Sequence, residues 1–220
     1  MHKLLASVLI SALAASAHGW VGYDLVPVEN GTVWPGEDPA VPDFNDGSYY
    51  TFDLVGIVFS RPEWGGDHWL GAIVTATIDG PGTFFLHPEG SDIPSDPNLV
   101  SQYPALEFDT YFPTMSGGLP WFPPGSPSYS GPGGGIITQI DAEWQDARPS
   151  QSYYEGTFQL ARFTVQHLGS EPLTLTLAGV GATYSSGALF PIGPFVVTIP
   201  EPSSLPLLAL GALPVLIRRR

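Results

Sequence analysis

The chain has 220 residues, of which 21 are aspartate or glutamate and only 7 are lysine or arginine, so its formal net charge at pH 7 is −14. This acid excess argues against binding to nucleic acid or anionic lipid, because both need lysine and arginine to neutralise phosphate. Polycations, metal cations and neutral polysaccharides remain compatible partners. The absence of cysteine excludes disulfides, so stability must come from a packed core.

The first 17 residues have the pattern of a secretory signal peptide. Lys3 supplies a positive start, residues 4–14 are mostly apolar, and Ala15 and Ala17 make a small-x-small cleavage site. We therefore expect signal peptidase to cleave here and the mature protein to begin at His18.

Residues 18–199 are predicted to form one acidic domain of short strands. Runs rich in aromatic and β-branched residues alternate with turns that contain glycine, proline, asparagine or aspartate. One helical turn is expected near residues 97–102, and residues 113–135 are expected to be a long loop rich in proline and glycine. The expected strands are residues 20–28, 49–60, 69–79, 83–86, 106–112, 136–144, 157–166, 173–180 and 195–199.

The pattern of the strands indicates the fold class. Residues 173–180 alternate leucine with threonine or alanine, as in a strand with one buried face, and no stretch of the domain shows sustained helical periodicity. Eight or nine such strands predict an all-β fold, an antiparallel β-sandwich of Ig-like, cohesin-like or jelly-roll topology. We expect a signal helix before this sandwich and a short apolar helix after it.

Residues 200–220 combine three features in order. A proline-bracketed acid comes first, formed by Pro200, Glu201 and Pro202. An apolar run then covers residues 205–217, and the chain ends in a basic cluster of Arg218, Arg219 and Arg220. The apolar run is shorter than the roughly 20 residues of a transmembrane helix and contains two prolines, so a permanent anchor is disfavoured. This tail resembles the PEP-CTERM sorting signal of bacterial exported proteins, which the membrane protease exosortase recognises.

The resemblance implies processing at or near the Pro-Glu-Pro motif, with only transient inner-membrane association through the tail. It also implies delivery to the cell envelope, the cell surface or an exopolysaccharide matrix. A second resemblance covers most of the domain: residues 23–25, 52–56, 103–110 and 156–164 look like the β-rich ectodomain common among such sorted proteins. That resemblance implies an exported β-sandwich and no biochemical role.

The sequence shows no established catalytic motif. Zinc-protease spacing, a Gly-x-Ser-x-Gly elbow, a phosphate-binding glycine loop and a nucleophilic cysteine are all missing. Two carboxylate pairs, Glu107 with Asp109 and Asp141 with Glu143, would each share one strand face about 6.5 to 7 Å apart, which approaches the carboxyl separation of an inverting glycosidase. Because such pairs arise readily on the solvated faces of acid-rich sheets, we expect no catalytic residue and no enzyme activity.

Two kinds of binding site are also suggested by residue type. Trp64, Trp69, Trp121 and Trp144 could stack on sugar rings, although for Trp69 and Trp144 we expect packing in the core instead. Two loops offer the hard oxygen ligands that Ca²⁺ prefers. The loop candidates are Asp43, Asn45, Asp46, Asp92, Asp96 and Asn98. Neither loop has EF-hand spacing, and turn formation explains both, so no cofactor is expected and Ca²⁺ is kept as an alternative.

The sequence thus predicts an exported, exosortase-processed protein of the cell envelope or exopolysaccharide matrix, with a structural or interaction role. Signal peptidase and exosortase are the expected partners during export, and exopolysaccharide or other envelope proteins are the expected partners afterwards. The alternative is a surface module that binds carbohydrate or Ca²⁺, and a glycoside hydrolase is less favoured.

Overall fold

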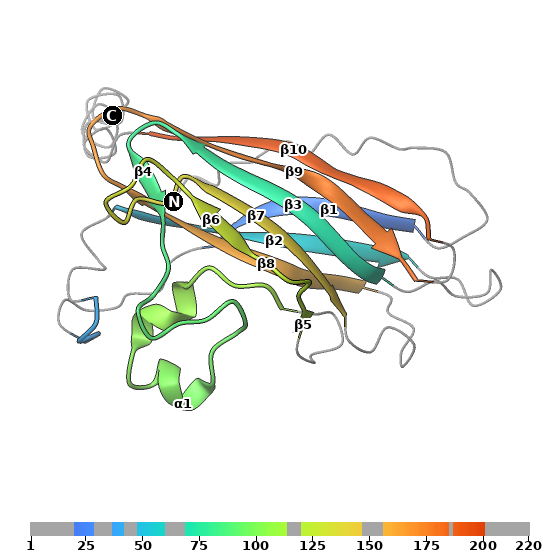
Figure 1. Ribbon diagram of the computed structural model, residues 1–220, viewed down its shortest axis with the longest axis horizontal. Coiled ribbons are helices and arrows are strands. Elements are labelled where there is room, and N and C mark those ends of the chain that lie inside the picture. The colour runs from blue at the N-terminus through green and yellow to red at the C-terminus, as the bar shows by residue number, and fades with distance from the viewer. Residues whose placement is uncertain are drawn as a thin grey trace, which may run out of the picture.

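The computed structural model describes residues 20–28, 37–41, 48–59, 69–113, 120–146, 156–184 and 187–200. Within these ranges nearly all regular structure is β, and the strands form two antiparallel sheets that lie one over the other (Figure 1). This arrangement agrees with the predicted β-sandwich. The two expected flanking helices fall outside the described residues, and no helix within them is long and apolar enough to cross a membrane.

One sheet has four strands in the order β1-β2-β8-β4. They are β1 (Trp20–Val28), β2 (Tyr49–Phe59), β8 (Gly156–His167) and β4 (Gly82–Phe84). The two central strands, β2 and β8, are rich in the β-branched and aromatic residues that favour strands.

The other sheet has six strands in the order β10-β9-β3-β7-β5, with β6 also paired to β7. They are β10 (Leu189–Ile199), β9 (Leu173–Thr183), β3 (Trp69–Asp79), β7 (Gln139–Asp146), β5 (Pro120–Trp121) and β6 (Ser128–Ser130). β1 and β10, the edge strands of the two sheets, also lie in contact.

The core lies between the two sheets and is filled by alternate residues of the strands. The three leucines of β9, Leu173, Leu175 and Leu177, are buried, which confirms the alternation predicted from the sequence. Aromatic rings fill the centre, where the Phe112 ring lies 5.0 Å from that of Trp144 and 5.9 Å from that of Phe163. All members of this cluster lie between Val21 and Ile199, so residues 18–199 contain the whole core formed by the described residues and are expected to fold by themselves.

A short helical segment lies outside the sandwich, between β4 and β5 (Figure 1). It contains α1 (Pro97–Val100), as predicted near 97–102, and the 3₁₀ helix η2 (Pro104–Phe108). The strand predicted over residues 106–112 is therefore wrong. The proline at the start of η2 fixes a φ angle that suits a helix. Ala105, Leu106 and Phe108 are buried as members of this 3₁₀ helix and not as the inward-facing residues of a strand.

The bounds of β4, β7, β8 and β9 differ from the prediction by up to three residues, and two larger differences follow from strand pairing. The proline- and glycine-rich region at 113–135 contains the short strands β5 and β6, because β7 offers its backbone groups to both. The last strand begins at Leu189 rather than at residue 195, because the pairing of β10 with β9 continues past a register shift between Ile192 and Phe195. That irregularity accommodates Gly193 and Pro194, which in the sequence resemble a strand break.

Candidate functional site

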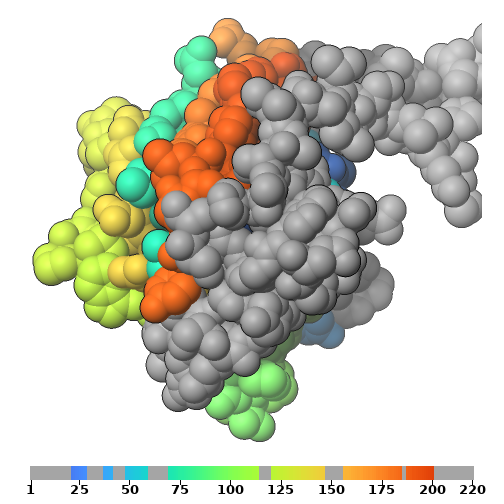
Figure 2. Space-filling model, turned by 90° about the vertical axis from the view of Figure 1, so that its right-hand side faces the viewer, coloured from blue at the N-terminus to red at the C-terminus, as the bar shows by residue number. Residues whose placement is uncertain are grey.

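A shallow hollow lies on the outer face of the six-stranded sheet, at the end where β3 begins. Its volume is about 140 Å³, and it is lined by residues of β3, β7, β9 and β10 and of the segment that starts at β5. Figure 2 looks toward this end of the sandwich and shows parts of β10, β3 and the β5 segment at the surface, in orange-red, teal and yellow-green. Enclosed small-molecule sites are typically about 300 Å³ or larger, so this hollow suits a ligand that lies across the sheet.

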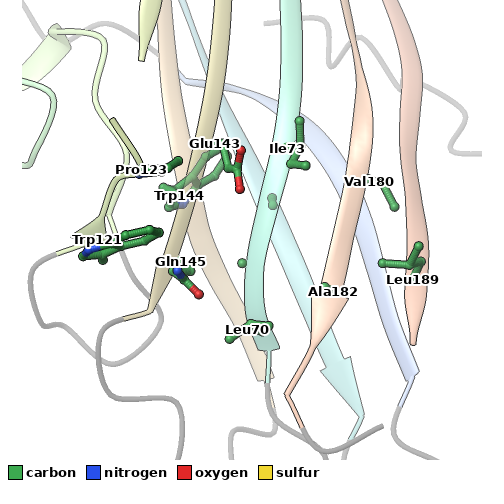
Figure 3. A pocket seen from close by; sticks show the side chains of 12 residues that line it. Leu70, Ile73, Trp121, Pro123, Glu143, Trp144, Gln145, Val180, Ala182 and Leu189 are labelled. Carbon is green, nitrogen blue, oxygen red and sulfur yellow. The ribbon is translucent and has the colours of Figure 1, made fainter. Parts of the chain in front are cut away.

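Strand pairing places the hollow's residues in one row across the sheet. Trp121 is paired with Gln145, Gln145 with Gly71, Gly71 with Ala182, and Ala182 with Leu189. Gly71 and Ala182, in the middle of this row, have small side chains or none, so the surface is hollowed there between Trp121 on one side and Leu189 on the other (Figure 3).

Gly71 cannot be replaced easily by a larger residue. A Cβ atom there would lie 2.5 Å from the carbonyl oxygen of Trp144 and 2.8 Å from the Cβ of Gln145. Close backbone approach therefore requires glycine at this position, and a consequence is that the floor has no side chain there.

Trp121 forms one side of the hollow and is 48% exposed. On the opposite side, Leu189 is 68% exposed, and between them Ile73 on β3 is 53% exposed. Large apolar side chains gathered on one exposed face commonly mark an interaction site. Trp121 is one of the two tryptophans, with Trp64, that the sequence favours as sugar-stacking candidates. Trp69 and Trp144 are buried in the core, as predicted, and Trp64 lies outside the described residues.

Polar groups reach the same face from β7. Glu143 and Gln145 line the hollow, because they alternate with the inward-facing Ala142 and Trp144. The hydroxyl of Ser126 donates to the backbone oxygen of Glu143 at 2.9 Å and accepts the Glu143 N–H at 2.7 Å. The backbone N–H and C=O groups of Glu143 are thus both hydrogen-bonded to Ser126, which fixes the backbone position from which the Glu143 carboxylate extends.

Asp141 and Glu143 share the outer face of β7, as predicted for this pair. The two oxygens of Asp141 accept hydrogen bonds from the Thr75 hydroxyl at 2.7 Å and from the Gln139 amide at 2.6 Å. Asp141 therefore links β7 to its neighbour β3, and Glu143 is the member of the pair that lines the hollow.

The other proposed pair, Glu107 with Asp109, is not on a strand. Glu107 is exposed in η2, whereas Asp109 follows the helix and is buried. The two carboxylates therefore do not share a strand face, because the strand expected at 106–112 is absent from this segment.

Asp109 belongs to a buried polar network that the sequence did not reveal. Its carboxylate accepts the backbone N–H groups of His87 and Thr110 at 2.8 and 2.9 Å. Burial raises the pKa of Asp109 to about 7, and the nearby Asp92 carboxylate adds to the increase, while the backbone N–H groups oppose it. Asp109 thus titrates near neutral pH rather than near pH 4.

Asp38 and His87 extend this network and are both buried. His87 Nδ1 accepts the Glu89 N–H at 3.1 Å, so Nε2 carries a proton and donates it to Asp38 at 3.2 Å. Asp38 also accepts the N–H groups of Ala40 and Ala105 at 2.9 Å each. The contacts tie residues 37–41 to the helical segment, which indicates a structural role.

Arg162 attaches the same segment to the four-stranded sheet. Its guanidinium donates to both oxygens of Asp53 at 2.7 and 2.9 Å, and to the backbone oxygen of Glu107 at 2.5 Å. The guanidinium carbon also lies 5.5 Å from the centre of the Tyr111 ring. This arginine is the one basic residue, of lysine and arginine, within the described ranges.

The described calcium candidates have protein partners. Asp96 is the N-cap of α1 and accepts the backbone N–H and the side-chain amide of Asn98. Asp92 accepts the hydroxyl of Tyr129. No group of three or more histidine and acidic side chains within the described ranges is arranged to hold a metal ion. Asp43, Asn45 and Asp46 lie outside these ranges.

The predicted processing residues are mostly beyond the described chain. β10 ends at Ile199 and Pro200 follows it. The remaining processing residues, Ala15, Ala17, Glu201, Pro202, Arg218, Arg219 and Arg220, lie outside the described ranges.

No protein-family model matches the chain, and no curated protein matches it. Among solved structures, the chain is similar to a DUF4466 family protein from Parabacteroides merdae, with 13% identity and a TM-score of 0.23. The match covers 80% of this chain and 44% of that one, so this chain spans less than half the length of that protein. A likeness at this level supports no argument about function.

Proposed function

We propose that this protein is exported through its signal peptide and processed by exosortase at or near Pro200, Glu201 and Pro202. It then has a structural or interaction role in the cell envelope, at the surface or in an exopolysaccharide matrix. The observation that most supports the proposal is the position of the last strand: β10 ends at Ile199, and the Pro-Glu-Pro motif starts at the next residue. Processing there would leave every described strand intact.

The charge of the domain supports an extracellular partner without phosphate. Residues 18–199 retain three arginines against 20 acids, and Arg162 is engaged by Asp53 and Glu107. Such a surface repels anionic polymers and tolerates neutral or cationic ones. Signal peptidase and exosortase are transient partners in this proposal, and nucleic acid is not a partner.

The strand order supports an Ig-like topology among the three sandwich types considered. In an Ig-like domain one sheet has the order A-B-E-D and the other contains C-F-G. β1-β2-β8-β4 matches the first order, and β3-β9-β10 matches the second. The segment between β4 and β8 then acts as an insertion that adds β5, β6 and β7 beside β3.

Replacing Glu201, the acidic residue of the Pro-Glu-Pro motif, tests the sorting proposal. We expect wild-type protein recovered from the envelope or medium to lack Arg218, Arg219 and Arg220, and Glu201→Ala to leave an unprocessed form in the inner membrane. Cell fractionation with mass spectrometry of the mature C-terminus measures both. Glu171→Ala, at an exposed turn before β9, is the matched control and should be processed like the wild type. Wild-type surface protein that keeps its three arginines would contradict the proposal.

A surface module for carbohydrate is the second candidate function, favoured by the exposure of Trp121 beside Glu143. Calcium binding is less supported, because the described candidate side chains already have protein partners. A glycoside hydrolase is the least favoured, since one of its two carboxylate pairs is not formed and Asp141 is engaged by Thr75 and Gln139.

A further inference from the structure

We propose that the outer face of the six-stranded sheet, from Trp121 on β5 to Leu189 on β10, binds a polysaccharide chain that lacks acidic groups. This inference depends on the proposed function in one respect, which is that an extracellular protein meets such a polysaccharide. It adds the site, the residues and the chemical class of ligand.

Trp121 supplies a platform for a sugar ring. The C–H face of a pyranose is apolar, and tryptophan combines a large flat apolar surface with a polar edge. Nearly half of the Trp121 side chain is exposed, although its backbone is fixed by pairing with Gln145. In Figure 3 the ring lies at one side of the hollow, and Ile73, Val180 and Leu189 continue the apolar surface across the sheet.

Glu143 and Gln145 supply hydrogen-bonding groups beside this platform. Sugar hydroxyls donate to carboxylate oxygens, and an amide side chain can both donate and accept. Both residues belong to a regular strand, and Ser126 fixes the backbone of Glu143 at its nitrogen and oxygen. Groups held by a rigid element bind with less loss of conformational entropy than groups on a loop.

The charge of this face selects the kind of polysaccharide. Asp141 and Glu143 give it negative charge, and the one described arginine, Arg162, is bound to Asp53 on the other sheet. Acidic polysaccharides are therefore repelled, whereas hydroxyl-rich and amine-bearing chains are compatible.

The shape of the face favours a chain over a single sugar. The row from β5 to β10 crosses four strand spacings, which is about 19 Å at the usual distance between strands. Among the described residues, Trp121, Ile73 and Leu189 are exposed along this length, and the hollow is too small to enclose a compact ligand. A short stretch of an extended polysaccharide can therefore lie from Trp121 toward Leu189.

A second copy of the same protein fits this face less well. In a two-fold symmetric dimer the same patch meets itself, so the negative patch that carries Asp141 and Glu143 would meet an equally negative patch. Like charges placed together across an interface oppose association.

The test measures binding of residues 18–199 to four soluble probes by affinity electrophoresis and calorimetry. The probes are hydroxyethylcellulose as a soluble β-1,4-glucan, soluble oligomers of poly-N-acetylglucosamine, their partly deacetylated form, and alginate as the acidic chain. We expect at least one of the first three to bind and alginate not to bind. Trp121→Ala should weaken binding about tenfold, the size expected for one stacking contact worth about 1.4 kcal/mol, and Glu143→Gln should weaken it less.

Matched control variants distinguish the loss of a contact in the proposed site from a general effect of removing an exposed apolar or acidic side chain. Leu99→Ala removes an exposed apolar residue on α1, and Glu171→Gln removes an exposed carboxylate at a turn; both should bind like the wild type. Equal melting temperatures for all variants show that folding is unchanged. The proposal is overturned if no non-acidic probe binds, if Trp121→Ala binds as well as the wild type, or if Trp121→Ala only abolishes self-association. These outcomes leave the sorting test unaffected, because it is read from the tail.

Discussion

At the scale of single residues, Asp109 is the group whose surroundings change its chemistry most. Its pKa is raised to about 7, first by burial and then by the Asp92 carboxylate, although the backbone N–H groups of His87, Thr110 and Ser91 stabilise the ionised form. Asp38 and His87 lie in the same network. In the unfolded chain the same carboxyl would titrate near pH 4. Between these pH values the folded protein binds a proton that the unfolded chain has lost.

This difference gives a signed prediction for stability against pH. Because the folded state binds more protons between about pH 4 and pH 7, the free energy of unfolding falls as pH rises through this window, by at most about 4 kcal/mol from Asp109. Asp109→Asn mimics the protonated form and keeps an oxygen for the His87 and Thr110 N–H groups, and it loses only the Ser91 N–H contact, which costs less than the buried charge. We expect the variant to be more stable than the wild type at pH 7.5 and less dependent on pH.

Urea unfolding at pH 4.5, 5.5, 6.5 and 7.5 measures the difference between the two proteins. Asp96→Asn is the control, since Asp96 is exposed at an N-cap where asparagine is also accepted. A wild type and an Asp109→Asn variant with parallel pH curves would contradict the prediction.

At the scale of secondary-structure elements, β7 determines how the second carboxylate pair can act. The strand directs Asp141 and Glu143 to the same face, and Asp141 is used in hydrogen bonds to Thr75 and Gln139. Hydrolysis of a glycosidic bond needs one carboxyl as an acid and the other as a base or nucleophile. We therefore expect residues 18–199 to show no turnover of polysaccharides, peptides or esters beyond that of Asp141→Asn/Glu143→Gln.

A panel of such substrates, incubated with and without Ca²⁺, measures this turnover. Activity that is present in the wild type and lost in the double variant at an unchanged melting temperature would show a glycosidase. Trp121→Ala helps to interpret the result, because it should reduce binding of polysaccharide without altering either carboxylate.

The strands could be predicted wherever the local pattern agreed with the tertiary contacts. β1 and β3 have the predicted bounds, and the leucines of β9 are buried as expected. The pattern failed at residues 106–112, where Pro104 and the buried Phe108 favour a 3₁₀ helix, and at β5, whose two residues become a strand only by pairing with β7.

The candidate site could be predicted only in part. The sequence indicated Trp121 and the Asp141 and Glu143 pair separately, but pairing across β5, β7 and β3 brings Trp121 and Glu143 to one hollow. The network of Asp38, His87 and Asp109 could not be predicted, because its members are 49 and 22 residues apart and no spacing rule joins them.

At the scale of the whole molecule, charge is the dominant property. Three arginines against 20 acids in residues 18–199 produce self-repulsion in the compact state. Salt screens this repulsion, with a Debye length of about 10 Å at 0.1 M. We expect the melting temperature to rise from low to moderate ionic strength, by about 2 to 4 °C if screening adds about 1 kcal/mol.

Differential scanning calorimetry in NaCl measures the rise, and CaCl₂ at equal ionic strength separates screening from calcium binding. A larger rise in CaCl₂ would support a calcium site. A melting temperature that falls as NaCl is added would mean that the carboxylates are paired more favourably than three arginines allow.

The position of the hollow relative to Pro200 has a mechanical consequence. The hollow includes Leu189 at the start of β10, and the sorting motif follows Ile199 at its end, so the two lie about 35 Å apart along an extended strand of 11 residues. If the protein is held at the C-terminal end of β10 and a polymer bound across the hollow pulls on β9, β3 and β7 at the other end, tension runs parallel to the strands. The hydrogen bonds between β10 and β9 are then loaded together in shear, rather than broken one after another as in a zipper. A tether with this geometry would resist stretching more than one pulled at right angles to its strands.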